Sequence, residues 1–137
     1  MSIKALTAVK TAPPKEQASA LETPFTFDGH TLSTPYYEIE LNEKGQLTSL
    51  YDKDNRRRVL APGERGNVLQ FFEDRPNMCD AWNINLFYQE KMWEAEDLVT
   101  MELTENGPLC AVIHMEWKYS KSYIWQDLCV YANERRI

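Results

Sequence analysis

The side chains best suited to chemistry in this sequence gather between Asn67 and Glu94. Carboxylates stand there at Glu73, Asp74 and Asp80, and two of the four tryptophans lie in the same stretch. Carboxylates can transfer protons or bind hydroxyl groups, and an aromatic face can pack against the apolar side of a ring. A core strand has little use for three acids, so one interpretation is a surface that meets a polar, ring-shaped ligand or another domain. The other is a structural loop that plugs the end of the fold.

The elements that position these side chains are a strand, a corner and a loop. The sequence predicts a strand over residues 68–72, which breaks at residues 73–77. Proline cannot donate to a sheet ladder, and Pro76 also restrains Arg75 towards an extended conformation. An extended loop, rich in aromatic and acidic residues, is therefore expected to follow over residues 79–84.

The rest of the chain alternates apolar and polar residues with the period of a β-strand. In one such run Tyr37, Ile39 and Leu41 share a face, and Gly45 follows in a turn that needs a positive φ. No stretch shows sustained helical periodicity, and one helical turn is expected, within residues 92–98. The pattern predicts an antiparallel all-β protein of eight to ten strands, with strands at residues 25–27, 31–34, 36–41, 47–51, 57–60, 68–72, 98–104, 109–119 and 123–132.

The sequences of the last strands indicate that the sheets are layered. Residues 98–104 alternate, with Val99, Met101 and Leu103 expected on one face. In the final hairpin, residues 109–132, both faces carry apolar side chains, so both are expected to be covered. Two layered sheets, an antiparallel β-sandwich, are the architecture that this pattern predicts.

Composition narrows the function classes. The chain has 137 residues, 15 basic against 21 acidic, and a net charge of −6, which argues against nucleic acid or an anionic membrane as the main partner. No run of 18 apolar residues exists, so no segment is expected to span a membrane, and the first residues have no continuous apolar stretch of a secretion signal. Cys79, Cys110 and Cys129 are odd in number and far apart, and are expected to be reduced and buried in a cytoplasmic protein. With His30 and His114 as its two histidines, the chain is expected to hold no metal.

The domain organisation follows from a change in composition. Residues 3–9 could form a short strand, and residues 11–23 are rich in Pro, Lys, Glu, Ala and Ser, where the pair Pro13-Pro14 prevents a helix from running through. Residues 1–23 are expected to form a linker or N-terminal extension. Residues 24–137 are expected to form a β-sandwich domain that stops in mid-fold at Ile137.

Two neighbouring segments resemble the family 38 α-mannosidases. Residues 72–91, FEDRPNMCDAWNINLFYQEK, resemble a motif of the middle-to-C-terminal region of these enzymes, and residues 41–70 resemble the strands before it. The resemblance runs from roughly Pro35 to Ile137. It departs at Met78-Cys79, where a Trp is common, and at Asn83, where an Asp is common.

The resemblance implies that this chain is the opening, partial portion of a galactose-mutarotase-like supersandwich. In the family, the nucleophile, the acid and the zinc ligands belong to a preceding α/β domain, so this chain alone is expected to be inactive and zinc to lie in that catalytic domain. By position, Asp80, Trp82 and Asn83 match a lip that faces the substrate. The alternative is structural, with Trp82 packed beneath the loop and Asp80 capping it.

Three functions remain open at this point. The first is a non-catalytic portion of a zinc-dependent α-mannosidase, and the second is a free-standing carbohydrate-binding module with an aromatic platform. The third is a mutarotase-like epimerase, which needs a general acid and base and so fits a chain with two histidines poorly. Expected partners are the rest of the same polypeptide, a mannose-containing oligosaccharide and a second copy that pairs through open sheet edges.

Overall fold

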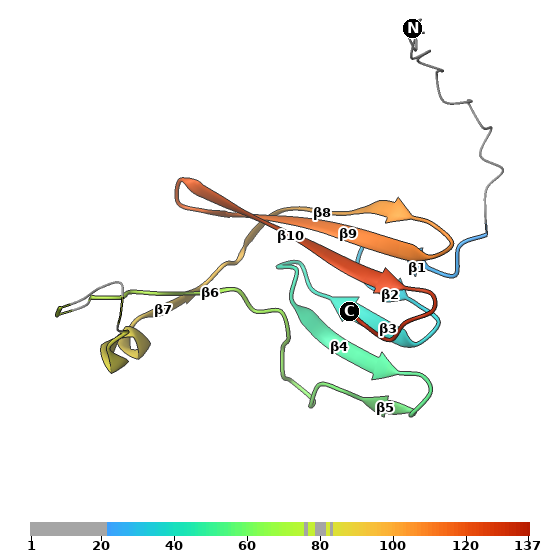
Figure 1. The fold of residues 1–137 in the computed structure, drawn as a ribbon, viewed down its shortest axis with the longest axis horizontal. Helices are drawn as coiled ribbons and strands as arrows, with labels where there is room; N and C mark the ends of the chain where they lie inside the picture. The colour runs from blue at the N-terminus through green and yellow to red at the C-terminus, as the bar shows by residue number, and fades with distance from the viewer. Residues whose placement is uncertain (1–21, 76, 79–81, 83) are drawn as a thin grey trace, which may run out of the picture.

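The computed structural model describes residues 22–75, 77–78, 82 and 84–137. Within them it contains ten strands and one short 3-10 helix (Figure 1). The predicted number of strands is confirmed. The strands are β1 (Thr26–Phe27), β2 (Thr31–Ser33), β3 (Tyr37–Leu41), β4 (Leu47–Asp52), β5 (Arg57–Arg58), β6 (Gln70–Phe72), β7 (Met92–Glu94), β8 (Asp97–Asn106), β9 (Cys110–Tyr119) and β10 (Ser122–Tyr131), and the helix is η1 (Leu86–Glu90).

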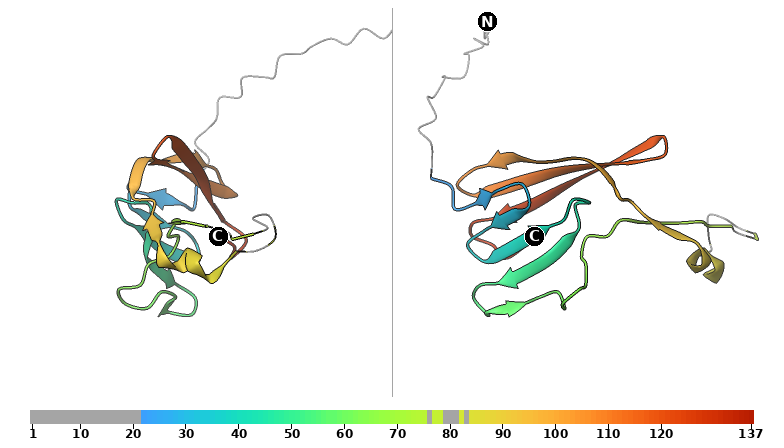
Figure 2. Two further views of the ribbon diagram at one scale, coloured as in Figure 1. Left: turned by 90° about the vertical axis from the view of Figure 1, so that its left-hand side faces the viewer. Right: turned by 180° about the vertical axis from the view of Figure 1, so that it is seen from behind.

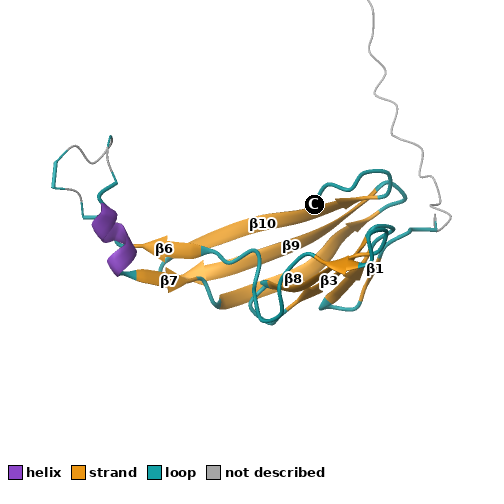
Figure 3. Ribbon diagram, turned by 90° about the horizontal axis from the view of Figure 1, so that it is seen from below, coloured by secondary structure: helices purple, strands orange, loops and turns teal. Residues whose placement is uncertain are grey.

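All the strand pairs are antiparallel, and they make three sheets. One has five strands in the order β1-β2-β3-β4-β5, one has three in the order β10-β9-β8, and β6 pairs with β7 alone. The five-stranded and three-stranded sheets face each other as two layers, with the β6–β7 ribbon extending beyond them (Figures 2 and 3). The predicted all-β antiparallel sandwich is confirmed.

In the five-stranded sheet, local sequence explains the turns. Asp28 follows β1, and its Oδ1 accepts hydrogen bonds from the backbone nitrogens of His30 and Thr31, at 2.9 and 2.7 Å. These two bonds hold the pKa of Asp28 below its ordinary value, the bond from Thr31 most. Gly45 closes the turn between β3 and β4 with a φ of +73°, a conformation that side chains with a Cβ rarely adopt.

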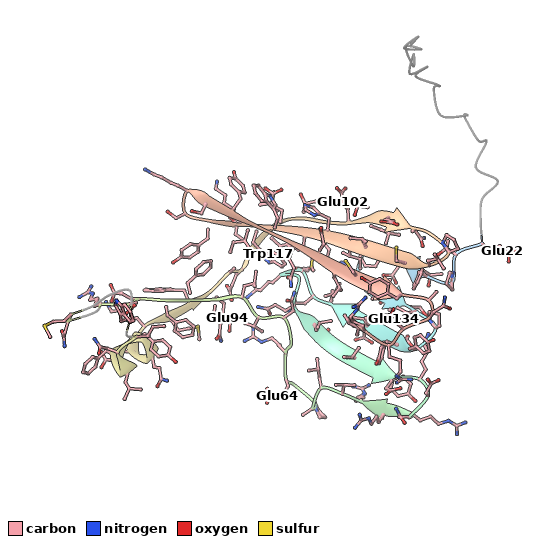
Figure 4. The ribbon with its side chains drawn as sticks, viewed as in Figure 1. Glu22, Glu64, Glu94, Glu102, Trp117 and Glu134 are labelled. Carbon is pink, nitrogen blue, oxygen red and sulfur yellow. The ribbon has the colours of Figure 1, made fainter. Side chains whose placement is uncertain are left out.

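The core lies between the two layers and follows the alternation of the strands. On β9, Ala111, Ile113, Met115 and Trp117 are buried, while the residues between them are partly exposed. They meet apolar side chains of the other sheet, among them Ile39, which is fully buried. Trp117 is labelled in Figure 4, close to the turn between β3 and β4. The predicted face of β9 is confirmed for these residues.

Two expectations about the last strands were wrong. The register shifts between Leu98 and Thr100, so Val99 is an extra residue on β8 and is 52% exposed, while Leu98 and Met101 both turn to the core. A bulge of this kind reverses the alternation at one point, which a strict period of two cannot show. The outer face of β10 is also uncovered by the described residues, because Trp125 there is 68% exposed.

The expected helical turn within residues 92–98 was wrong as well, since those residues form β7 and the start of β8. The 3-10 turn lies just before them, at Leu86–Glu90. Of the cysteines, Cys110 and Cys129 are free but only half-buried, and Cys79 lies outside the described residues. The expected linker at residues 1–23 lies almost wholly outside them too. No described helix is long and apolar enough to cross a membrane.

Candidate functional site

Residues 70–94, which we call the arm, carry the candidate site. The arm comprises β6, β7, η1 and the loop between β6 and η1, and it projects from one end of the sandwich (Figures 1 and 3). Eight of its described large apolar side chains are exposed, although exposed apolar residues on a single-domain surface are usually scattered. They are Phe72, Met78, Trp82, Ile84, Leu86, Phe87, Met92 and Trp93.

The arm is held to the sandwich by stacked rings. Phe71 of β6 stacks on Tyr119 at the end of β9, with ring centroids 3.9 Å apart and planes 13° apart. On the next strand Trp93 is paired with Phe71 in register. A two-stranded ribbon alone is marginally stable in water, so this anchor on β9 is what allows the ribbon to project.

An ion pair fixes the base of the arm. Arg65 donates two hydrogen bonds to Glu94, to Oε2 at 2.7 Å and to Oε1 at 2.8 Å, and Gln46 reaches the same carboxylate at 3.2 Å. Glu94 is labelled where the arm meets the sandwich (Figure 4). The Arg65 guanidinium holds the pKa of the Glu94 carboxyl below its ordinary value, and Glu94 in turn raises the pKa of Arg65. This planar two-point contact orients the ribbon as well as attaching it.

Nearer the tip of the arm, a second ionic cluster lies just after the end of β6. Glu73 contacts Lys91 at 2.8 Å and Arg75 at 2.7 Å, and with Phe87 and Glu90 these residues line a cleft of about 120 Å³. The bond from Lys91, followed by that from Arg75, lowers the pKa of Glu73. A carboxyl with a lowered pKa is ionised at neutral pH, so Glu73 suits accepting hydrogen bonds and is a poor general acid.

The structure describes one of the three residues predicted to face a substrate. Trp82 is 87% exposed, whereas the structural alternative expects its ring to be packed. Asp80 and Asn83 lie outside the described residues. The separation of the Asp80 and Glu73 carboxylates therefore lies outside them too. The substrate-facing role of the three therefore stays a prediction.

Sequence reasoning missed how much of the arm is apolar and exposed. It singled out the acids and Trp82, yet Ile84, Leu86 and Phe87 are also exposed, by 71%, 78% and 61%. The signal in the sequence was the largely apolar run Ile-Asn-Leu-Phe-Tyr. This run has neither the alternation of a half-buried strand nor the periodicity of an amphipathic helix. Such a run on a projecting ribbon fits a surface that another domain covers.

Away from the arm, His114 is an interstrand side chain. It lies on β9 opposite Asp127 of β10, with Nδ1 and Oδ1 2.6 Å apart. On the same sheet, Cys110 donates to Glu105, and this bond raises the pKa of the Cys110 thiol. Among the residues that the structure describes, no three His, Cys, Asp or Glu side chains gather as a group that could hold a metal ion.

Comparison with known proteins agrees with the resemblance seen in the motifs. The model of the glycosyl hydrolases family 38 C-terminal domain matches residues 32–137. Alpha-mannosidase G of Dictyostelium discoideum is 30% identical over 112 residues, which make up 77% of this chain and 10% of that protein. The chain thus spans about a tenth of the length of the curated relative that it matches.

Proposed function

This chain belongs to the family of glycosyl hydrolase family 38 C-terminal domains, and from that premise we propose that it is a non-catalytic portion of a zinc-dependent α-mannosidase. Its arm reaches the catalytic domain of the same polypeptide and brings Trp82 to the rim of the substrate site. The observation that carries the proposal is the exposure of Trp82, 87%, at the end of a ribbon that is fixed at its base.

The arm divides its surface between two tasks in this proposal. The aromatic face of Trp82 packs against the apolar side of a mannose ring, as aromatic side chains do in sugar sites. Ile84, Leu86 and Phe87 supply the apolar contact with the catalytic domain, because such side chains stay exposed at a cost unless a partner covers them. Glu73 stays ionised and holds Lys91 and Arg75 in place.

Zinc enters the proposal as part of the catalytic domain. The described residues of this chain offer no group of ligands for it. The carboxylates that cleave the glycosidic bond are likewise assigned to the catalytic domain, because Glu73 is already occupied by two cations. A mannose-containing oligosaccharide is the substrate class.

The proposal is tested in the enzyme polypeptide that carries this domain. Trp82→Ala should lower turnover of an aryl mannoside, whereas Trp125→Ala, an exposed tryptophan on the outer face of β10, serves as the matched control and should leave it unchanged. Both variants should keep the unfolding midpoint of the parent. Equal turnover for parent and Trp82→Ala would remove the substrate-facing role.

A carbohydrate-binding module that works by itself is the competing function, and titration of the purified 137-residue chain separates the two. Calorimetry with mannose and mannobiose should detect no binding. The isolated chain has the exposed Trp82 ring but lacks the catalytic domain that would form the rest of the sugar site. Binding in the micromolar range would favour the independent module. The isolated chain should also leave an aryl mannoside uncleaved with or without added divalent ions.

A further inference from the structure

Asn67 stands where the chain leaves the sandwich for the arm. The residue before it, Gly66, is still bridged to Leu47 of β4 by backbone hydrogen bonds of 2.9 and 3.0 Å, and β6 begins at Gln70. Asn67 itself has a φ of +53°, in the left-handed region. Side chains with a Cβ rarely adopt this region, although asparagine tolerates it better than most. The chain therefore bends at Asn67, within the segment that runs from the five-stranded sheet to the arm (Figure 1).

The side chain of Asn67 bonds to both layers of the sandwich. Its Nδ2 donates to the backbone oxygen of Gly45 at 3.1 Å and to Oε1 of Gln126 at 3.0 Å, and its Oδ1 accepts from Nε2 of Gln126 at 2.9 Å. Gly45 lies in the turn between β3 and β4, whereas Gln126 lies on β10. An amide side chain has two N–H donors, and here both are used. The three bonds thus fix the orientation of this amide.

Both partners of the Asn67 amide are themselves held by the core. In the turn, the carbonyl oxygen next to that of Gly45 belongs to Lys44 and accepts the 2.7 Å bond from the buried Trp117. On β10, Gln126 is paired in register with Met115 of β9, which is fully buried. The amide therefore joins the start of the arm to the part of the sandwich that packs around Trp117.

The two other contacts that hold the arm lie on either side of Asn67 in the sequence. Arg65, which pairs with Glu94, precedes it, and Phe71, which stacks on Tyr119, follows it. Both contacts hold the ribbon to the sandwich through side chains alone. The bend between them is a feature of the backbone, and the Asn67 amide is the side chain that holds it.

We propose that Asn67 is a positioning residue, whose left-handed backbone and three amide bonds set the angle at which the arm leaves the sandwich, and thereby where Trp82 is presented. Residues held in sparsely populated backbone regions collect at functional sites, where the surrounding contacts keep them in place. Asn67 acts through the arm and not on the substrate itself. The assignment of the angle stands on the geometry of this chain, and its effect on turnover rests on the role proposed for Trp82.

The alternative is that Asn67 only completes a turn. A turn needs the backbone conformation alone, and glycine adopts a positive φ without strain. Asn67→Gly therefore keeps the bend and removes the three amide bonds. Gln126→Met leaves Asn67 in place and removes its partner on β10, with a side chain of similar length.

Residual dipolar couplings in the 137-residue chain measure the angle of the arm. The amides of β6 and β7 report the orientation of the ribbon, and those of β9 report the sandwich in the same sample. In Asn67→Gly the couplings of β6 and β7 should fall to roughly half of their parent values, because the ribbon then samples several directions, while those of β9 stay unchanged. Gln126→Met should lower them less, since the bond to Gly45 remains. The double variant should match Asn67→Gly, because both substitutions remove one shared amide pair.

Arg56→Gly is the matched control. Arg56 also has a positive φ, +51°, but it lies in the turn between β4 and β5, so this change should leave the couplings of β6 and β7 as they are. Parent couplings in Asn67→Gly would overturn the proposal, because the bend would then need no amide. An equal fall in β9 and in the ribbon would overturn it too, since Asn67 would then only support the fold. If Asn67→Gly does not fold, the same two outcomes in Gln126→Met decide.

The enzyme polypeptide that carries this domain tests the consequence for the reaction. Asn67→Gly should lower kcat/KM for an aryl mannoside by about tenfold, since misplacing a group by about 1 Å can cost that much or more. Combined with Trp82→Ala it should add no further loss, because the arm then has no ring to present. Arg56→Gly should keep the parent value.

The outcomes for the angle and for the substrate role are distinguishable. A loss of turnover in Trp82→Ala with none in Asn67→Gly would overturn the positioning role, as would losses that add in the double variant. Unaltered turnover in Trp82→Ala, together with reduced β6 and β7 couplings in Asn67→Gly, would remove the substrate role and keep the assignment of the angle to Asn67.

Discussion

The Nε1 of Trp117 donates a hydrogen bond of 2.7 Å to the backbone oxygen of Lys44, and so ties β9 to the turn between β3 and β4. The contact is as close as the turn allows. A Cβ placed on Gly45 would lie 2.6 Å from the indole carbon Cζ2 of Trp117. One glycine thus permits both the positive φ of the turn and the seating of the largest buried side chain.

Gly45→Ala should therefore destabilise the domain more than a positive φ alone explains. We expect a loss of about 3 kcal/mol in the free energy of unfolding, part from the backbone and part from the clash with Trp117. Gly63→Ala is the matched control, because Gly63 has a φ of +83° and nothing within 4 Å of the added methyl group, and it should cost about 1 kcal/mol. Urea unfolding measures both, and equal losses would refute the role given to the indole.

Substitutions of the buried and of the exposed tryptophan should likewise differ in their cost to stability. Trp117 is 1% exposed and Trp82 is 87% exposed. Trp117→Phe should cost about 2–4 kcal/mol through the cavity and the lost hydrogen bond, and Trp82→Ala less than about 0.5 kcal/mol. Acrylamide should quench the Trp82 fluorescence readily, so Trp82→Ala should reduce the quenchable fraction of the total. A large loss of stability in Trp82→Ala would show that its ring is packed.

Acid unfolding should show how much the contact between Arg135 and Asp52 stabilises the domain. Asp52 is buried, and hydrogen bonds from Asn55 and then Arg135 lower its pKa from the ordinary 3.8. A carboxyl whose folded pKa is lowered contributes stability above its unfolded pKa, and this stability is lost as the pH falls below about 4. Arg135→Met should raise the pH at which the domain unfolds.

Arg136→Met is the control for that titration. Arg136 pairs with Glu134 at 3.3 Å, and both side chains are mostly exposed, so its loss should leave the acid midpoint in place. Circular dichroism between pH 7 and pH 2 follows both variants. A shared midpoint for Arg135→Met and Arg136→Met would mean that the bond to Asp52 contributes nothing measurable.

The base of the arm gives a further comparison between two ion pairs. Arg65 meets Glu94 through two bonds, and the Glu94 side chain is only 17% exposed, whereas Lys44 meets Glu96 once, with both side chains about half exposed. Arg65→Met should lower the urea midpoint more than Lys44→Met does. It should also speed amide exchange in β6 and β7, since the ribbon loses its anchor. Unaltered exchange there would show that the Phe71–Tyr119 stack suffices.

The sequence by itself determined what is local. The alternation from Ala111 to Trp117 predicts which side of β9 is buried, because neighbouring side chains of a strand point to opposite faces. Gly45 marks its turn since few other residues adopt a positive φ. The motif over residues 72–91 also sufficed to indicate the family, and the match over residues 32–137 confirms it.

Only the tertiary structure decided what depends on partners distant in sequence. The bulge at Val99 is set by the register of β8 against β9, and the reach of the arm is set by Phe71 stacking on Tyr119. The open edge of β10 follows from how many strands each layer holds, a property of the whole sheet. The bulge, the stack and the open edge cannot be read from the periodicity of the sequence. Each depends on pairing between residues that are far apart along the chain, and a local sequence pattern does not encode which residues pair.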